Sequence, residues 1–538
     1  MNTVAIAPQI TLQAMARKAT GLIAAIAVAL SIVAIRPLAA STFSAKADPA
    51  LYRAAQAAPA STLPVIVRER TPASTEAEGI VWRLGGRVSR ELPIIGSFAA
   101  RVPARSLSAL AEAPSVTRVW GDASIRMAGV DMNKYASWAP NTIWRASIGL
   151  DKQSYTGAGV GVAVLDTGVS PNQDLGSRLV YHASFAPDAD VYDHFGHGTH
   201  MAGVIAGDGT LSNGAYQGVA PRANVVSVKV AAPDGSTDVS VVIDGLQWVY
   251  ANRADYNIRV LNMSFGTDST QGYLLDPLNY AVEQVWKKGV MVVVAAGNRG
   301  PNAGTITKPG DDPYVLTVGA VDVKGTSDRN DDVVAPFSSQ GPTQDGFTKP
   351  DVVAPGITIV SDRDPGSMID AAYPEARVGE HYFKGTGTSQ ATAVVSGLAA
   401  LMFQANPSLT PDVAKATILG SAKNIATSGP GSGQGEVWVP GAVGAAASGT
   451  YVKTPANQLL APSTGMGTLE GSRGSMHIYA NLNGTGTLQM VTGEIGFNGT
   501  AWSGTAWSGT AWSGTAWSGT AWSGTAWSGT AWSDQAWN

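Results

Sequence analysis

The chain has 538 residues, of which 44% are hydrophobic, and a formal net charge of −4. A chain of this length suits two or three folded units with tails, and it can bury a large core. The acidic balance offers no basic surface for nucleic acid, and the sequence contains no nucleic-acid-binding motif. There is no cysteine, which excludes disulfide bonds, cysteine-based zinc sites and cysteine nucleophiles.

The amino terminus has the pattern of an export signal. Arg17 and Lys18 precede an apolar stretch of 15 residues at 21–35, and small residues follow as far as Ala45-Lys46-Ala47. This pattern predicts a signal peptide over residues 1–47 and a secreted protein, extracellular or associated with the cell envelope. A membrane span needs about 20 apolar residues, so the stretch is short for one, and an uncleaved anchor is the alternative.

Residues 48–130 have their own pattern of elements, in which apolar runs alternate with segments of helical periodicity. The predicted elements are strands at 63–67, 97–102 and 116–120 and helices at 74–84 and 104–113. We therefore expect a small α+β domain here.

Residues 131–450 alternate β-rich runs with helical segments, which is typical of α/β proteins. The predicted strands are 161–165, 225–230, 258–263, 290–295 and 315–318, and the predicted helices are 239–250 and 275–287. Thr410 and Pro411 predict the N-cap and first residue of a later helix that runs to about residue 419. The expected fold is a doubly wound, mainly parallel sheet with helices on both faces.

Three short motifs in this second unit carry residues that suit nucleophilic catalysis. Val-Leu-Asp-Thr-Gly ends a predicted strand at Asp166, Gly-His-Gly-Thr-His opens a small-residue helix at His197, and Gly-Thr-Ser-Gln-Ala-Thr opens another at Ser389. The chain order Asp, His, Ser is one of the few known for the triad of acyl transfer. Because a hydroxyl is a poor nucleophile at pH 7, we expect His197 to accept the Ser389 proton while Asp166 fixes the tautomer of His197.

A fourth motif predicts the group that would stabilise the oxyanion of the intermediate. The predicted strand at 290–295 continues through Ala-Gly to Asn298. The side-chain amide of Asn298 is expected to donate a hydrogen bond to the oxyanion, beside the backbone N–H of Ser389.

These four motifs, in this order and separated by Val-Ala-Pro at 219–221 and Leu-Asn-Met-Ser-Phe-Gly at 261–266, make residues 135–447 resemble the bacterial subtilisin-like serine proteases. The resemblance implies hydrolysis of peptide bonds in protein or peptide substrates through an acyl-enzyme intermediate. It also implies that two segments line the specificity pocket and pair with an extended substrate. These are Ser264, Phe265 and Gly266, and Ala295, Ala296 and Gly297.

None of those six residues is charged, which favours broad specificity with an apolar residue before the scissile bond. Val239 stands where the family often has a large side chain, so a more distal subsite is expected to be open. The chain departs from the family at two positions near the nucleophile, where Gln390 replaces the usual Met and Ala393 the usual Pro. Neither residue carries the chemistry, so the departure concerns local oxyanion geometry.

The unit at 48–130 resembles the inhibitory propeptide of the same family, by its position and by Ile-Gly-Ser-Phe-Ala-Ala-Arg-Val at 95–102. The resemblance implies that it assists folding and blocks the cleft until it is cut, which would make it the enzyme's own inhibitor. An ordinary accessory domain is the alternative.

No metal is expected to take part in the chemistry. His194, His197 and His200 cluster in sequence, but they lack the spacing of a zinc-binding motif. Asp174 and the loop at 207–214 fall where relatives bind a structural calcium ion, yet Asp208 is the only acidic residue of that loop. We expect no required cofactor, with a structural calcium ion as the alternative.

After residue 450 the composition shifts toward Gly, Thr and Ser, giving an extension at 451–498 with a candidate hairpin formed by 475–479 and 486–491. From 499 to 538 the chain is a tail in which Gly-Thr-Ala-Trp-Ser repeats seven times and which holds 8 of the 15 Trp. One interpretation is docking of the indoles on a cell surface or a polymer. The other is a disordered extension with no fixed partner.

The sequence therefore predicts a secreted, propeptide-bearing, subtilisin-like serine endopeptidase with a Trp-repeat tail. A peptide transferase or ligase of the same fold would share every catalytic residue, and an esterase would share the acyl-enzyme chemistry. A surface-binding protein with a silent catalytic domain is a further alternative, and the intact set of Asp166, His197, Asn298 and Ser389 argues against it.

Overall fold

The structure is a computed structural model of the chain. It describes residues 46–467, except 48, 73, 123, 127–133, 136–137, 187, 189, 268, 270, 428, 453–455 and 458, together with 479–480 and 489–490. All of these residues belong to one compact body, Phe43–Asn538. Residues 1–45 of the predicted signal peptide and the Trp-repeat tail lie outside the described residues. The last two residues of that predicted peptide are described, and Ala47 is buried and bridges Val119 of the N-terminal unit.

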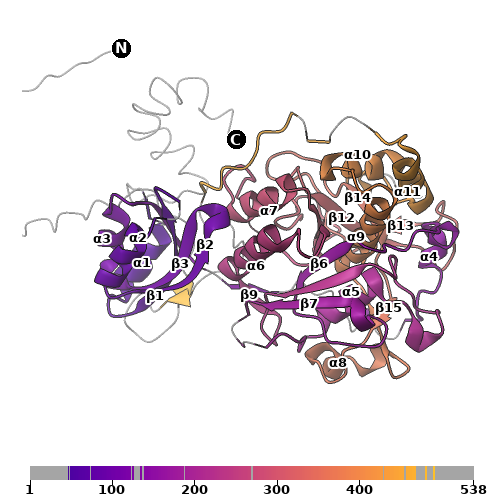
Figure 1. Ribbon diagram of the computed structural model, residues 1–538, viewed down its shortest axis with the longest axis horizontal. Helices are drawn as coiled ribbons and strands as arrows, with labels where there is room; N and C mark the ends of the chain where they lie inside the picture. Colours follow the sequence, from indigo (N-terminus) through magenta and orange to yellow (C-terminus); the bar gives the residue numbers. More distant parts are fainter. Residues whose placement is uncertain are drawn as a thin grey trace, which may run out of the picture. The chain divides into compact units, whose positions relative to one another are not determined.

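An N-terminal unit (the described residues of 46–126) is built on a four-stranded antiparallel sheet in the order β2-β3-β1-β4 (Figure 1). Its strands are β1 (Thr62–Glu69), β2 (Arg87–Leu92), β3 (Ser97–Pro103) and β4 (Val116–Gly121), and its helices are α1 (Pro49–Ala57), α2 (Glu76–Arg83) and α3 (Leu107–Glu112). The predicted elements of this region are present, although the predicted helix at 104–113 begins as a 3₁₀ turn. The sequence analysis missed α1 and β2.

Successive side chains of each strand point to opposite sides, which gives this sheet two different faces. Val65, Val67 and Phe98 point one way and form a core with the unit's own helices. Ile66 and Ala99 point the other way and belong to the core of the rest of the protein. The N-terminal unit therefore buries its second face against the remainder of the chain.

The main unit (the described residues from 134 onward) contains an eight-stranded sheet in the order β13-β12-β11-β10-β6-β8-β7, with β14 paired to β12. All its pairings are parallel except that between β12 and β13. The strands are β6 (Gly161–Asp166), β7 (Leu179–Ser184), β8 (Asn224–Lys229), β10 (Ile258–Met263), β11 (Met291–Ala295), β12 (Leu316–Asp322), β13 (Val333–Val334) and β14 (Val352–Pro355). The predicted α/β fold is confirmed.

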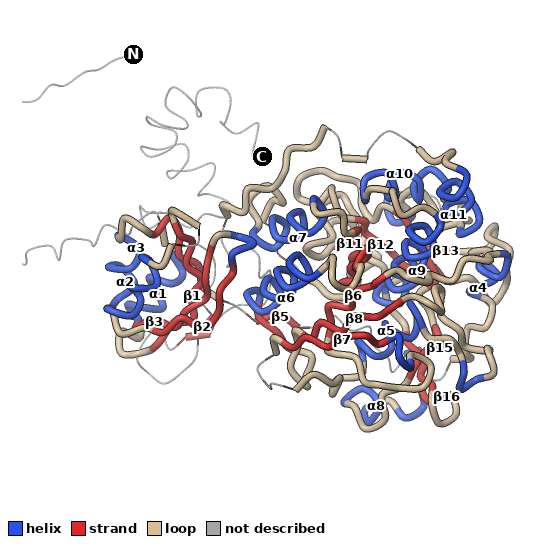
Figure 2. Tube along the Cα trace, viewed as in Figure 1, coloured by secondary structure: helices blue, strands red, loops and turns tan. Residues whose placement is uncertain are grey.

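Helices cover both faces of this sheet, with α6 and α7 side by side on one face and α5 and α9 packed together on the other (Figure 2). The helices of the main unit are α4 (Trp144–Ser147), α5 (His197–Ala206), α6 (Val239–Asn252), α7 (Pro277–Lys287), α8 (Met368–Ala372), α9 (Thr388–Ala405), α10 (Pro411–Ser421) and α11 (Val439–Ser448). Thr410 caps α10 as predicted, because its hydroxyl accepts from the N–H of Val413 at 3.3 Å.

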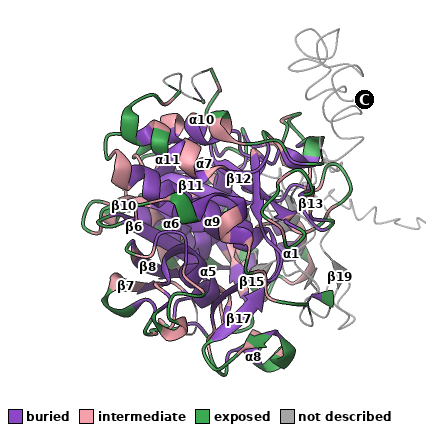
Figure 3. Cartoon of the chain, turned by 90° about the vertical axis from the view of Figure 1, so that its right-hand side faces the viewer, coloured by how far each residue is buried: buried purple, intermediate pink, exposed green. Residues whose placement is uncertain are grey.

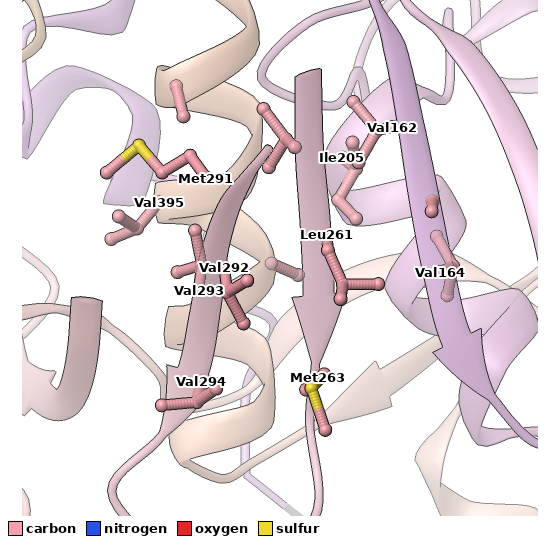
Figure 4. Close-up of a cluster of buried hydrophobic side chains, with 14 of the residues drawn as sticks. Val162, Val164, Ile205, Leu261, Met263, Met291, Val292, Val293, Val294 and Val395 are labelled. Carbon is pink, nitrogen blue, oxygen red and sulfur yellow. The ribbon is translucent and has the colours of Figure 1, made fainter. Parts of the chain in front are cut away.

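Burial of the central strands on both faces explains why their sequences are continuous apolar runs. Strands β6, β10 and β11 bury both faces, with side chains such as Val162, Leu261 and Val293 in contact with the helices (Figure 4). Helix α9 is buried from Thr388 to Phe403 (Figure 3) and packs so closely that a Cβ on Gly397 would lie 2.5 Å from Val219. A side chain larger than that of glycine at position 397 would therefore force this helix away from Val219.

Several smaller elements were not predicted. Strands β15 (Ile359–Asp362), β16 (Arg377–Val378) and β17 (Tyr382–Gly385) form a separate three-stranded sheet, and β5 (Ser124–Arg126) pairs with β9 (Ser236–Asp238). Strands β18 (Tyr479–Ala480) and β19 (Gln489–Met490) pair antiparallel inside the region predicted as a hairpin. Among the described residues, no helix is long and apolar enough to cross a membrane.

Candidate active site

The parallel strands bring three of the predicted segments to one edge of the sheet. Asp166 is the last residue of β6, Ser264 follows β10 directly, and Asn298 lies three residues beyond β11. These three strands are neighbours, and the carboxyl ends of parallel strands lie at the same edge. Helix α9, which begins at Thr388, packs against the same strands and carries Ser389 in its first turn.

Asp166 and His197 form a buried pair. The carboxylate of Asp166 is fully buried, and its Oδ1 accepts from the backbone N–H of Thr167 at 2.8 Å and pairs with Nδ1 of His197 at 2.7 Å. This contact assigns the Nδ1 proton to the side that faces the carboxylate, which leaves Nε2 as the basic nitrogen. The arrangement is the one in which a carboxylate orients an imidazole to act as a general base.

Close backbone packing places His197 at that position. His197 is the first residue of α5, and Gly196 precedes it with φ of +99°, a conformation that favours glycine. A Cβ on the next residue, Gly198, would lie 2.1 Å from the carbonyl oxygen of Gly168 in the turn after β6. The two glycines of the Gly-His-Gly motif therefore let the helix start directly against the turn that follows Asp166.

Asp193 is a functional candidate that the sequence analysis missed. Its buried carboxylate accepts five hydrogen bonds, from the backbone N–H groups of Phe195, Gly196 and Thr199 and from the hydroxyls of Thr167 and Thr199, at 2.7 to 3.1 Å. Thr167 in turn accepts from the N–H of Gly198 at 2.9 Å. Asp193 thereby ties the turn after Asp166 to the start of α5, and the signal for it was an acidic residue just ahead of a glycine-opened helix.

The Ser389 hydroxyl is held by the segment that follows β10. Its Oγ donates to the backbone carbonyl of Ser264 at 3.0 Å, and Oγ of Ser264 donates back to the carbonyl of Ser389 at 3.3 Å. In the part of the chain that the structure describes, no hydrogen bond joins Ser389 to His197. Hydrogen bonds between nucleophile and base are often loose before substrate binds, so this geometry is compatible with catalysis.

Asn298 is oriented by the residue before the nucleophile. Its side-chain oxygen accepts from both the N–H and the hydroxyl of Thr388, each at 2.9 Å. Because the oxygen is fixed on Thr388, the amide group of Asn298 is held in one orientation beside the start of α9. The sequence placed Asn298 near Ser389, and the structure brings the two segments together.

The charges around His197 and His200 affect the two rings in opposite directions. Burial alone would lower the pKa of His197, but the charge and hydrogen bond of Asp166, with the charge of Asp193, outweigh it and raise that pKa above its usual range. Burial, with the nearby His197, lowers the pKa of His200 to about 4. His200 is therefore neutral at pH 7, and it is buried in the core.

The predicted substrate-binding segments lie next to the catalytic candidates. Phe265 and Ala296 are buried, and Thr307 and Lys308 connect the two segments through backbone hydrogen bonds to Ala296 and Thr267. The side chain of Lys308 is fully buried and pairs with Asp311 and Asp276, so its charge is neutralised inside the protein.

A strand that leads out of the N-terminal unit pairs with a segment next to the loop that precedes His197. Strand β5 pairs antiparallel with β9, with Ile125 opposite Thr237. The residue before β9 is Gly235, where a Cβ would lie 2.9 Å from the ring of Phe195, two residues before His197. The end of the N-terminal unit therefore runs as an added strand beside the His197 loop.

The residues considered for calcium have partners within the protein. The carboxylate of Asp174 is occupied by the N–H of Leu211 at 2.8 Å and the hydroxyl of Tyr382 at 2.6 Å. The guanidinium of Arg178 donates to the backbone carbonyl of Asp174 and forms an ion pair with Asp208 at 3.3 Å. The described residues contain no group of three or more metal-ligating side chains, and His194 pairs with Asp190 instead.

Comparison with known proteins agrees with this geometry. The subtilase family profile matches residues 157–437. The serine protease AprX of Bacillus subtilis (strain 168) is 41% identical over 319 residues, covering 58% of this chain and 71% of that protein. Subtilisin Savinase of Lederbergia lenta is 38% identical over 275 residues, covering 51% of this chain and 85% of the relative.

A solved structure gives the same result for the fold. The crystal structure of fervidolysin from Fervidobacterium pennivorans, a keratinolytic enzyme related to subtilisin, superimposes with a TM-score of 0.55 at 25% identity. The match covers 71% of this chain and 61% of fervidolysin, so this chain spans less than two thirds of that protein. With the profile matching more than half of its length, the chain belongs to the subtilase family of serine-type endopeptidases.

Proposed function

We propose that this protein hydrolyses peptide bonds with Ser389 as nucleophile, His197 as general base and Asp166 as the group that orients His197. The observation that carries the proposal is the buried 2.7 Å contact between His197 Nδ1 and Asp166 Oδ1 at the end of β6, with Ser389 in the first turn of a helix packed on the same strands.

In the proposed reaction, the Ser389 hydroxyl turns from the carbonyl of Ser264 toward Nε2 of His197 when substrate binds. Oγ attacks the carbonyl carbon of the scissile bond while its proton passes to Nε2, and Asp166 stabilises the imidazolium that forms. The amide of Asn298, the N–H of Ser389 and the amino end of α9 stabilise the oxyanion. Return of the proton to the leaving amine releases the first product, and water then repeats the steps to free Ser389.

We also propose that an apolar side chain precedes the scissile bond in preferred substrates. The predicted pocket segments, 264–266 and 295–297, contain no charged side chain, and the nearby Lys308 is neutralised by Asp276 and Asp311. The charge of Lys308 is therefore not free to bind an acidic side chain of the substrate. The preference is tested by comparing kcat/KM for peptides with Phe, Lys and Glu at this position.

The N-terminal unit is proposed to be the inhibitory propeptide. Its support is the pairing of β5 with β9, because an extended segment added to an edge beside His197 resembles the way a substrate would bind. Cutting is then expected between Arg126 and Ala136, directly after this strand. Export through the signal at 1–47 and docking through the tail at 499–538 are proposed on the sequence alone.

Mass spectrometry of the exported protein tests catalysis and maturation together. The wild-type chain is expected to begin between residues 127 and 136, whereas Ser389→Ala should remain uncut. An intact N-terminal unit on fully active enzyme would show instead that this unit is an accessory domain. Repeating the peptide assay with an added amine separates hydrolysis from transfer, since a ligase would give the aminolysis product as its main product.

Truncation after Thr500 tests the tail. The truncated enzyme should cleave a soluble peptide at the wild-type rate but no longer remain with cells or with an insoluble substrate, because the indoles supply most of the tail's apolar surface. Equal retention of the two forms would contradict docking.

A further inference from the structure

The N-terminal unit contacts the main unit through a first surface that is centred on α6. Beside the apolar face of its sheet, Arg90 forms an ion pair with Asp244, the N–H of Ile94 donates to Gln247 at 3.1 Å, and Asp122 accepts from Ser240. Asp244, Gln247 and Ser240 all belong to α6.

A second surface comes from the opposite end of the chain. After α11, the extension passes over the main unit and is fixed there by hydrogen bonds from buried or half-buried groups. Asn457 donates to the carbonyl of Tyr314 at 3.0 Å, the hydroxyl of Tyr273 donates to the carbonyl of Ala461 at 2.9 Å, and the N–H of Ser463 donates to Glu283 at 2.7 Å. The extension is therefore anchored on the main unit as far as Ser463, where its partner Glu283 belongs to α7.

The next four residues, 464–467, touch both units at once. On the main unit, the N–H of Thr464 donates to the carbonyl of Leu274 at 2.8 Å, and Gly465 lies against the ring of Tyr280, where a Cβ would come within 2.9 Å. Gly465 has φ of +60°, so glycine suits this position for two reasons.

On the N-terminal unit, the same four residues meet the sheet face that points toward the main unit. Nη1 of Arg68 donates to the carbonyls of Thr464 and Gly465, each at 3.4 Å, and lies 3.1 Å from the sulfur of Met466. The indole N–H of Trp120, a side chain that is 1% exposed, donates to the carbonyl of Gly467. Arg68 also lies over the ring of Tyr280, 5.8 Å from its centroid.

We propose that residues 464–467 are a clasp that holds the N-terminal unit on the main unit after the chain between them has been cut. The proposal rests on the cut assigned to the region after β5. Before the cut, the covalent link keeps the two units together whether or not these contacts hold. After it, the N-terminal unit stays only as long as its contacts last, and the clasp supplies partners for Arg68 and for the otherwise buried N–H of Trp120.

The clasp is effective because it is ordered in advance. Residues 457–463 are already fixed on the main unit, so residues 464–467 lose little freedom when the N-terminal unit binds. Releasing the unit would leave the carbonyls of Thr464, Gly465 and Gly467 and the indole of Trp120 to find water, which raises the barrier to dissociation. The C-terminal extension thus controls how long the proposed inhibitor stays bound.

Two truncations of the full chain isolate the clasp. Both carry Ser389→Ala and are cut in trans by a trace of wild-type enzyme. A stop after Gly467 removes only the residues beyond the clasp, whereas a stop after Ser463 removes the clasp but keeps its anchor. Retention of the N-terminal fragment is followed over time by native mass spectrometry. We expect fragment loss to be about 10-fold faster with the stop after Ser463 and within twofold of the full chain with the stop after Gly467.

A pair of arginine variants checks the contact itself. Arg68→Met should speed fragment loss roughly 3- to 10-fold. Arg101→Met is the matched control, because Arg101 lies on the neighbouring strand β3 with an exposed side chain and should leave the rate unchanged. Equal retention in the two truncations, or equal rates for the two arginine variants, would overturn the proposal.

A measurement on the uncut Ser389→Ala chain does not depend on cleavage. Amide hydrogen exchange at β1 and β4 should be faster after the stop at Ser463 than after the stop at Gly467. No difference would also overturn the proposal. Activity is a separate readout, measured on the same truncations with Ser389 restored: if fragment loss changes as expected but peptide hydrolysis is the same before and after release, the clasp stands and the inhibitory role of the N-terminal unit fails.

Discussion

Asp193→Asn is the substitution that most sharply tests how His197 is positioned. Three of the five donors on the Asp193 carboxylate are backbone N–H groups, which donate hydrogen bonds but cannot accept them. The site is therefore built for a side chain that accepts at both of its terminal atoms, as a carboxylate does. An amide keeps one oxygen at most. If its nitrogen replaces Oδ2, the bond from the N–H of Thr199 is lost, and if it replaces Oδ1, the bonds from the N–H groups of Phe195 and Gly196 are lost, because the threonine hydroxyls can instead accept from the amide.

At about 1.5–3 kcal/mol for each hydrogen bond to a charged group, losing the bond from the N–H of Thr199 predicts a cost of about 1.5–3 kcal/mol in the free energy of unfolding. The cost is measured by urea denaturation in the Ser389→Ala background, which prevents self-digestion. In the active background, kcat/KM should fall, and the apparent pKa of its acidic limb should move down, because the charge of Asp193 raises the pKa of His197.

The matched control is Asp190→Asn in the same loop. Asp190 is half-exposed, and the N–H of Tyr192 and the ring of His194 hold its pKa at about 2. These partners lie within its own loop, so its loss should cost less free energy of unfolding than Asp193→Asn and should leave the pH profile of kcat/KM unchanged. A loss below about 1 kcal/mol for Asp193→Asn, together with an unchanged pH profile, would refute the positioning role.

Three further predictions concern the chemistry. Asn298→Ala should lower kcat by about 10² to 10³ with little change in KM, the scale set by the corresponding residue of subtilisin, and a larger change in KM than in kcat would point to a role in substrate binding instead. Mild peroxide should leave most of the activity, because Gln390 beside the nucleophile cannot form a sulfoxide, and rapid inactivation would contradict this expectation. With increasing pH, kcat/KM should rise through an apparent pKa above 6.5. The general base must be neutral, and Asp166 raises the pKa of His197 above its ordinary value of 6.5. A midpoint below 6.5 would be inconsistent with the charge of Asp166 acting on the ring.

Much of the site could be predicted because its residues end or begin regular elements. Asp166 closes a strand whose apolar run is visible in the sequence, and His197 and Ser389 open helices marked by glycine and small residues. Parallel strands bring such ends to one edge whatever the loops between them do, so local motifs were enough to place these residues together.

The rest depends on contacts that leave little trace in local sequence. Asp193 acts mostly through backbone N–H groups that only the folded turn brings together. The clasp is made largely by backbone carbonyls, which every residue has and which therefore give no signal in the sequence. Arg68 and Trp120 also lie 347 to 398 positions from their partners in the chain. Tyr382 reaches Asp174 from the unpredicted sheet of β15, β16 and β17, so the occupied state of that carboxylate could not be predicted either.

The central claim is that Asp166, His197 and Ser389 act as one catalytic unit, and a cycle of Ser389→Ala, His197→Ala and the double variant tests it most directly. Each single variant should lower kcat by about 10⁶, a scale known from subtilisin, and the double variant should lose almost nothing more, because neither residue works without the other. If the two losses were additive, the double variant would be slower than each single variant by about the full effect of the second substitution. That result would contradict the account.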